Sequence, residues 1–334
     1  MKKILIDTDP GMDDTLAIIL AIKSRAVQLL GISSVAGNYP IEVTTRNALK
    51  TVELLKRTDI PVARGMQKPL ARPLAKDPFS HGSDGQAETH LPEPTTKPSG
   101  KHGVDQIIDM VRANPGEVTV ITLGPLTNLA MAFMKEPDIV PLVKEVVAIA
   151  GSFGLNKYAF ANATGDTPQS EWNVFVDPEA ARLVFESGVP VRAVGLDVAT
   201  HFDINFTEEQ LATLKASARP EANIVEKMVR FVQGRGFESY CVLIDSMAVA
   251  GRGRDQGRAD PGADGGRFPP PSRLGPPARD RGRLERRLSA LPRPGDDPGA
   301  GVSDGPRDRR KDLCRRPGQD PRRLSWQAGR GLVV

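Results

Sequence analysis

The sequence predicts an α/β fold, in which a mostly parallel central sheet is covered by helices on both faces, as in Rossmann-like proteins. Two observations predict it. Short apolar runs alternate along residues 1–250 with segments whose apolar residues recur at helical spacing. Such an alternation favours parallel strands joined by crossover helices. Polar and acidic residues follow several of the runs, and ligands bind beyond the carboxyl ends of strands in such folds.

Each predicted strand is a short apolar run between polar or turn residues. Lys2–Asp7 is a clear example, because KKILID is apolar through its centre and ends in an acid, as a buried parallel strand can. The other predicted strands are Val27–Gly37, Pro61–Arg64, Val118–Leu123, Val143–Ala150 and Val189–Leu196.

The predicted helices have apolar residues three or four positions apart. They are Asp13–Ser24, Pro40–Arg57, His102–Ala113, Leu126–Lys135, Pro178–Ser187 and two within Glu208–Val232. The Pro-rich segment Pro69–Ser99 has no such periodicity and is predicted to be a long loop. Loops of that length in a compact domain are usually functional or disordered.

Composition divides the chain after residue 250. Residues 251–334 hold 19 Arg, 15 Gly and 12 Pro and carry a charge of +9, whereas residues 1–250 carry −5. We therefore expect an α/β domain over residues 1–250 and an Arg/Gly/Pro-rich tail that cannot bury a core. Three interpretations of the tail stay open: genuine disorder, translation in a shifted reading frame, and a nucleic-acid-binding arm. The last lacks interleaved aromatic residues, since only Phe268 and Trp326 occur there.

The same composition excludes several classes of protein. Cys241 and Cys314 are the two cysteines of the sequence, which excludes a disulfide framework and a multi-cysteine zinc module. No apolar run approaches the ~20 residues of a membrane span. The first residues contain no signal-peptide core. We expect a cytoplasmic protein with no membrane partner, for which nucleic acid is an unlikely ligand.

Four carboxylates gather within the eight residues Asp7–Asp14, at the end of the first predicted strand. Pro10-Gly11 suits a type II turn, which would fold the two following acids back toward Asp9. Clustered carboxylates repel one another, and a hard cation such as Ca²⁺ or Mg²⁺ would relieve that repulsion. The alternative is that Asp13 caps the next helix and the other acids are solvated.

The segment Asp7–Asp14, with the sequence DTDPGMDD, resembles the opening signature of the inosine–uridine-preferring nucleoside hydrolases. Four later segments are similar to that family in the same order: Val35–Asn38, His81–Gly85, Leu123–Asn128 and Glu171–Ala181. The resemblance covers about residues 1–250. It implies the Rossmann-like nucleoside hydrolase fold and a homodimer or homotetramer.

The resemblance also implies an activity, which is Ca²⁺-dependent hydrolysis of ribonucleosides to ribose and free base, a reaction of purine and pyrimidine salvage. Asp9 would act as the general base. Asp9, Asp14, Asp245 and the Leu123 backbone carbonyl would ligate the metal, and Asp7 would support these ligands. The nucleoside substrate would be bound by Asp13, Asn38, His81, Asn162, Glu171 and Asn173.

These residue types suit that chemistry. Glycosidic cleavage builds positive charge on the sugar ring, and carboxylates and amide oxygens around the ribose stabilise it. A metal acidifies a water molecule, and a nearby carboxylate takes its proton. Glu171 and Asn173 lie two residues apart, so on an extended segment they would share one face. Asn128 is interpreted as a capping residue.

One position departs from the family pattern. Many members carry a histidine immediately before the metal-binding aspartate, thought to protonate the departing base, but here that residue is Ile244, which cannot donate a proton. His81, Tyr240 and Cys241 are alternative donors. One function that therefore stays open is that of a relative that binds nucleosides without turnover. Another is a Mg²⁺-dependent phosphohydrolase of the haloacid-dehalogenase type, because that class also begins with paired aspartates after a strand.

Overall fold

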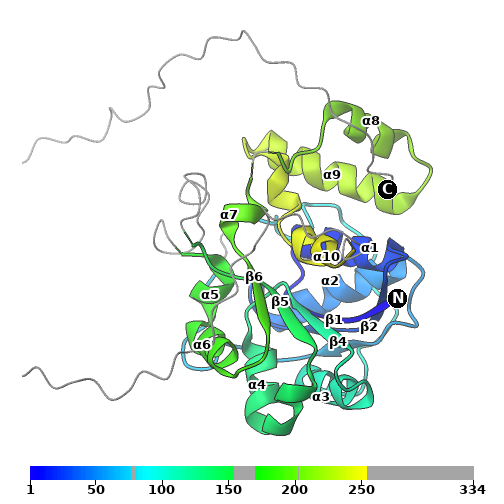
Figure 1. Ribbon diagram of the computed structural model, residues 1–334. Coiled ribbons are helices and arrows are strands. Elements are labelled where there is room, and N and C mark those ends of the chain that lie inside the picture. Colours follow the sequence, from blue (N-terminus) through cyan, green and yellow to red (C-terminus); the bar gives the residue numbers. More distant parts are fainter. Residues whose placement is uncertain (77–79, 154–169, 202, 254–334) are drawn as a thin grey trace, which may run out of the picture. The chain divides into compact units, whose positions relative to one another are not determined.

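A six-stranded parallel sheet forms the centre of the computed structural model, which describes residues 1–76, 80–153, 170–201 and 203–253 (Figure 1). The strand order is β3-β2-β1-β4-β5-β6, and each neighbouring pair is parallel. The strands are β1 (Lys2–Thr8), β2 (Val27–Ser34), β3 (Val62–Arg64), β4 (Val118–Thr122), β5 (Glu145–Ile149) and β6 (Val191–Val194). The predicted fold class is confirmed.

Helices cover both faces of this sheet, because alternate residues of each strand are apolar on opposite sides. Ile4 and Ile6 of β1 pack into one core cluster, whereas Leu5 between them packs into another. The first cluster is completed by α1 (Met12–Lys23), α2 (Ile41–Leu54) and α10 (Ser246–Gly253). The second is completed by α3 (Gly103–Ala113), α4 (Thr127–Lys135) and α6 (Pro178–Glu186).

A third layer covers the outer side of α1. Helix α9 (Pro220–Gly234) and the short η3 (Ser239–Val242) contact α1, and α8 (Glu208–Ala216) packs on α9. Their apolar residues form one cluster with Met12 and Leu16 of α1. Figure 1 shows α8 and α9 beyond α1, on the side away from the sheet. Because α1 is enclosed on both sides, the acids at its N-terminus are held in a fixed place.

The strand order creates a topological switch point at β1. This strand pairs with β2 on one side and with β4 on the other, and the chain continues outward in both directions. Crevices for ligands form at such points, outside the carboxyl ends of the strands. The first acids of Asp7–Asp14 lie at the end of β1, and Leu123 follows β4, with its N–H donating to Asp7 O at 2.8 Å. The sheet thereby brings these two segments together.

Several short helices were not predicted from the sequence. They are η1 (Pro137–Leu142), α5 (Trp172–Val176), α7 (Leu196–Ala199), η3 and α10. Most are too short for a helical period to show. The extended segment predicted at Glu171 and Asn173 is wrong, since Glu171 caps α5 and Asn173 lies inside it.

The long Pro-rich segment is a loop as predicted, because its described residues 69–76 and 80–99 contain no helix or strand. In the described part of the chain, no helix combines the length and apolarity that a bilayer crossing requires. Helix α10 continues past residue 250 to Gly253. The rest of the Arg/Gly/Pro-rich tail lies outside the described residues, so the domain boundary at residue 250 stays a prediction.

Candidate functional site

The connection between β1 and α1 places the acids. Gly11 has φ −89° and ψ −159°, whereas its position in a type II turn requires a positive φ, so that predicted turn type is wrong. Glycine is required here for a different reason. A Cβ at Gly11 would lie 2.6 Å from Nδ1 of His81, so the imidazole ring packs directly against this backbone.

Buried aspartates gather where β1 leads into α1 and where α10 begins. They are Asp7, Asp9, Asp13, Asp14 and Asp245. Asp13, Asp14 and Asp245 each offer one oxygen, and these oxygens all lie within 4.8 Å of one another. Asp245 directly precedes α10 and is more than 200 residues from the others in sequence. The fold therefore assembles a three-carboxylate group that could hold a metal ion.

Burial dominates the electrostatics of this group. It raises the pKa of Asp14 to about 6, with the charge of Asp13 as the next cause. The pKa values of Asp9 and Asp245 are also raised well above the ordinary value, by burial first and then by neighbouring aspartates. Buried charges persist when they are paired or coordinate a metal. Oxygen ligands of this kind suit Ca²⁺ or Mg²⁺.

Asp9 lies in a narrow space beside this group. Its Oδ2 accepts a hydrogen bond from the Asn38 N–H at 2.6 Å, and its Oδ1 has no hydrogen-bond partner among the described residues. A Cβ at Gly37 would lie 2.0 Å from Oδ2, and a Cβ at Gly124 would lie 2.5 Å from Oδ1. These two glycines have no side chain that would collide with the Asp9 carboxylate.

Asp14 is oriented by the same turn. Thr8 Oγ1 donates to Asp14 Oδ1, and the Gly11 N–H donates to Oδ2 at 2.9 Å. Asn38 Nδ2 donates to the Asp9 carbonyl at 3.3 Å and lies 3.4 Å from Asp14 Oδ2. Asn38, predicted to bind the sugar, thus lies in the site and contacts both of these aspartates.

Asn128 is not the capping residue that the sequence suggested. The N-cap of α4 is Leu126, which makes no side-chain cap. Instead, the buried Asn128 Nδ2 donates to Asp7 Oδ1 at 2.7 Å and to the Ser34 carbonyl at 2.9 Å. Its Oδ1 accepts from the Met66 N–H at 2.8 Å. This amide thereby fixes the side chain of Asp7, whose pKa burial raises to about 7.

The segment predicted to bind ribose reaches the site through α5. Asn173 Nδ2 donates to the Leu123 carbonyl at 2.6 Å and to the Ile149 carbonyl at 3.1 Å. The Glu171 carboxylate accepts from the N–H groups of Asn173, Val174 and Gly151 at 2.9, 3.0 and 3.2 Å. Burial raises its pKa to about 7.

These contacts place Glu171, Asn173 and the Leu123 carbonyl side by side at the ends of β4 and β5. Asn162, which was also predicted to bind the substrate, lies outside the described residues.

His81 forms part of the wall next to the acids. Its Nδ1 accepts the Met12 N–H at 3.4 Å and lies 3.6 Å from Asp13 Oδ1. The Tyr39 ring contacts His81 edge-on, with 6.4 Å between ring centroids.

The position before Asp245 provides no proton donor. Ile244 is partly buried and packs against the core cluster of α1, α2 and α10. Cys241 lies near the acids, since the charge of Asp13 contributes, after burial, to raising the pKa of its thiol to about 12. Burial also raises the pKa of the neighbouring Tyr240 to about 12.

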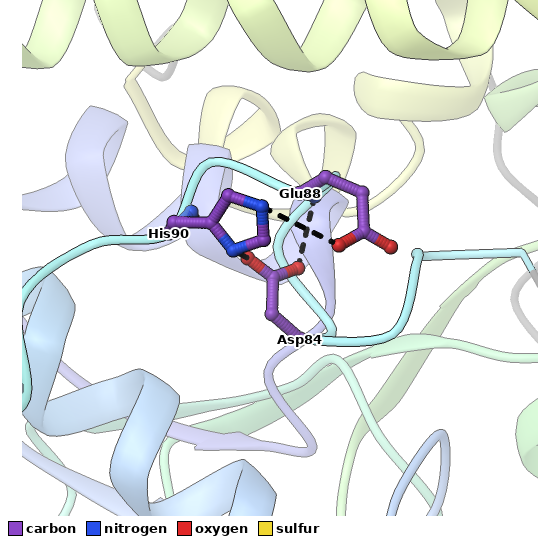
Figure 2. A group of neighbouring side chains, drawn as sticks. All are labelled: Asp84, Glu88 and His90. Carbon is purple, nitrogen blue, oxygen red and sulfur yellow. Dashed lines mark hydrogen bonds and ion pairs between the residues drawn. The ribbon is translucent and has the colours of Figure 1, made fainter.

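A second group of metal-ligand types lies in the loop that carries His81. Asp84, Glu88 and His90 each offer one atom, and these atoms lie within 4.8 Å of one another (Figure 2). Here, however, the carboxylates are engaged by the loop itself. Asp84 accepts three backbone N–H groups, and Glu88 accepts the N–H and hydroxyl of Ser83. The group is therefore accounted for by the structure of the loop.

The fold and the site together define an α/β protein with a buried acidic site, able to hold a metal, at the switch point of a parallel sheet. The chain belongs to the inosine-uridine preferring nucleoside hydrolase family, whose family model matches residues 4–256. Membership makes it an enzyme of the N-ribosyl hydrolase class.

Individual relatives agree with this assignment. A protein of Oryza sativa subsp. japonica named probable uridine nucleosidase 2 is 37% identical over 244 residues, which are 72% of this chain and 69% of the relative. The pyrimidine-specific ribonucleoside hydrolase RihA of Escherichia coli is 39% identical over 228 residues, 68% of this chain and 70% of the relative. The solved plant nucleoside hydrolase PpNRh1 superposes with a TM-score of 0.67 at 30% identity, covering 76% of this chain and 79% of that one.

Proposed function

We propose that this chain hydrolyses the N-glycosidic bond of ribonucleosides in a Ca²⁺-dependent reaction, with Asp9 as the general base. One observation carries the proposal. Asp9 Oδ1 is buried without a hydrogen-bond partner among the described residues, and it lies beside a group of buried carboxylates that could hold a cation. The geometry supports a base next to a metal, which is the arrangement that activates water.

Asp9, Asp14, Asp245 and the Leu123 carbonyl are proposed as the metal ligands. The donor set fits a hard cation, because carboxylate and carbonyl oxygens are the ligands that Ca²⁺ takes. The Leu123 carbonyl accepts one hydrogen bond, from Asn173 Nδ2 at 2.6 Å, and a carbonyl oxygen has a second lone pair. Asp13 lies close enough to Asp14 and Asp245 to contribute as well. When bound, Ca²⁺ would acidify a water molecule and orient the ribose hydroxyls.

Asp9 would take the proton of the attacking water at Oδ1. Oδ1 has no hydrogen-bond partner among the described residues, so its lone pairs are not engaged by the fold. The hydrogen bond from the Asn38 N–H to Oδ2 fixes the orientation of the carboxylate, so that Oδ1 is the atom that reacts. A side chain at Gly37 or Gly124 would displace this carboxylate.

The ribose would be held by Asp13, Asn38, Asn162, Glu171 and Asn173. Asn173 uses both of its amide hydrogens within the fold, so Oδ1 is its atom for a ribose hydroxyl. The Glu171 carboxylate accepts three backbone N–H groups, and its oxygens have about four acceptor sites, which leaves one for the sugar. Negative charge here would stabilise the positive charge that develops on the sugar ring.

Uridine is the first substrate to test, because the rice and Escherichia coli relatives are named for uridine and pyrimidine ribonucleosides. Inosine is the comparison, since the family is named for both. His81 is the proposed contact to the substrate beside Asp13. The expected cytoplasmic location and homo-oligomeric state stay predictions.

The test is release of reducing sugar from uridine and inosine by the wild-type chain and by Asp9→Asn. We expect the substitution to reduce kcat by about 10²–10⁴-fold, the range for loss of a general base. Asp59→Asn is the matched control, because Asp59 is exposed and pairs with Arg57 away from the site. Nucleoside binding without sugar release would identify a binding-only relative, and release of phosphate from phosphate esters would identify a phosphohydrolase.

A further inference from the structure

The loop that carries His81 is folded tightly although residues 80–99 contain no helix or strand. The Ala87 N–H donates to the His81 carbonyl at 2.8 Å, which closes the loop on itself. Ala87 is buried in the cluster that joins α1 to α9. Tyr39 supports the same turn, because its hydroxyl donates to the Gly82 carbonyl. The position of His81 against the acids therefore depends on this loop.

Three residues of the loop adopt a backbone conformation that they disfavour. Ala87, Glu88 and His90 have φ values of +58°, +55° and +50°. Residues with a Cβ rarely occupy this left-handed region. Such conformations persist where the surrounding structure holds them in place, and they cluster at functional sites.

The Asp84 carboxylate provides that support. Its Oδ1 accepts the N–H groups of Gln86 at 2.7 Å and of Glu88 at 2.9 Å, and its Oδ2 accepts the N–H of His90 at 3.1 Å. Two of these three donors belong to residues with positive φ. Figure 2 shows the Asp84 carboxylate facing Glu88 and His90. One side chain thus holds the backbone of the whole turn.

Two further contacts tie this turn to the acids. Asn47 Nδ2 on α2 donates to the Asp84 carbonyl and to the Pro10 carbonyl, both at 3.1 Å. Gln86 Nε2 lies 3.1 Å from Thr15 Oγ1, and that hydroxyl donates to the Gly11 carbonyl at 2.6 Å. The loop and the Asp9–Asp14 turn are therefore braced against each other.

We infer that Asp84 is a positioning residue, which sets the loop so that His81 lies against the acid turn before a nucleoside binds. This inference rests on the proposed function. If the loop is preset, substrate binding does not have to order it. If the support is removed, the competent loop is populated only in part, and the apparent affinity falls by that fraction. We expect KM to rise and kcat to change little, because the loop is ordered again once the substrate is bound.

The experiment compares Asp84→Asn with Glu88→Gln in the full chain, by steady-state kinetics with uridine and by amide hydrogen exchange over residues 81–90. For Asp84→Asn we expect KM to rise about tenfold with kcat within about threefold. Exchange at Gln86, Glu88 and His90 should become faster. Glu88→Gln is the matched control, since it removes a charge from the same loop, whereas its side chain contacts Ser83 and His90 Nε2 and accepts none of the three N–H groups that Asp84 holds. It should behave as wild type.

A rescue separates positioning from general stability. Glycine adopts positive φ without the penalty of a Cβ, so His90→Gly added to Asp84→Asn should recover part of the lost affinity. If Asp84→Asn does not fold, Asp84→Glu, which keeps the charge but shifts the oxygens, takes its place with the same expected result.

Unchanged KM and exchange, or a fall in kcat at constant KM, would overturn the inference. If the wild-type chain shows no turnover, the proposed function fails separately, and uridine affinity measured by calorimetry replaces KM.

Discussion

Asp9 lies between two glycines whose missing side chains define the space around its carboxylate. Gly124→Ala would place a Cβ 2.5 Å from Oδ1 and 3.0 Å from the Asp9 backbone nitrogen, so the carboxylate must move. A displacement of about 1 Å at a reacting group can reduce the rate about 10²-fold, and we expect kcat to fall by that order. Circular dichroism should remain that of the wild type.

Gly100→Ala is the matched control for this substitution. A Cβ at Gly100 meets no atom within 4 Å, so the same chemical change should leave kcat unaltered. Wild-type turnover in Gly124→Ala would show that the space around Asp9 is wider than the structure has it, and the role of Oδ1 would have to be reconsidered.

Asn128 connects three elements through one buried amide. It joins α4 to Asp7 on β1, to the Ser34 carbonyl on β2 and to the N–H of Met66. Asn128→Leu has a similar volume but leaves these groups unsatisfied, and each buried unsatisfied group costs ~1–3 kcal/mol. We therefore expect the free energy of unfolding to fall by about 3 kcal/mol. Urea unfolding at constant m-value measures it.

Asn223→Leu provides the comparison for this prediction. Asn223 on α9 is partly exposed and its Nδ2 donates to the Ser217 carbonyl, which water can satisfy instead. A loss below about 1 kcal/mol is expected. Equal losses of unfolding free energy in the two variants would mean that the buried hydrogen bonds of Asn128 stabilise the fold no more than an exposed one does.

The elements show how far a sequence of this kind can be interpreted. Strands such as Lys2–Thr8 and helices such as Met12–Lys23 were predictable, because a buried sheet imposes apolar runs and covering helices impose a helical period. Helix α5 was not, because five residues contain too little of a period to show. The acids of the site were predictable because they cluster in the sequence. Their place at the carboxyl ends of the strands agrees with the rule for ligand sites in α/β folds.

Other features of the site depend on contacts between residues that are far apart in the sequence, and no local sequence pattern predicts such contacts. The role of Asn128 as a connector requires Asp7, Ser34 and Met66 to meet at one point, which only the assembled sheet provides. Gly11 is needed because His81, 70 positions away, packs against it. The positive φ values of Ala87 and Glu88 are likewise invisible in sequence, since neither residue type is enriched in that region.

At the scale of the whole molecule, the buried acids make stability depend on pH. Burial raises the pKa values of Asp7 and Glu171 to about 7 and of Asp14 to about 6, from ordinary values of 3.8 and 4.5. The folded protein therefore keeps protons that the unfolded chain has released. In this window the free energy of unfolding of the metal-free protein falls as pH rises from about 4 to about 7.

Ca²⁺ should reverse that trend, because it binds the ionised carboxylates. At a free concentration of 100 times Kd it adds about 2.7 kcal/mol to the free energy of unfolding. We expect Tm in chelator to be lower at about pH 8 than at about pH 5.5, and the rise on adding Ca²⁺ to be larger at the higher pH. A Tm in chelator that is flat or increases with pH would contradict the account of the buried acids.

We propose that the buried carboxylates at the switch point hold a metal with which Asp9 hydrolyses ribonucleosides. The most direct test is reducing-sugar release from uridine by the purified full chain with Ca²⁺, after excess chelator, and after Ca²⁺ is restored. We expect turnover that is abolished by chelator and recovered by the ion. Sugar release that chelator leaves unchanged, or none under any of the three conditions, would contradict it.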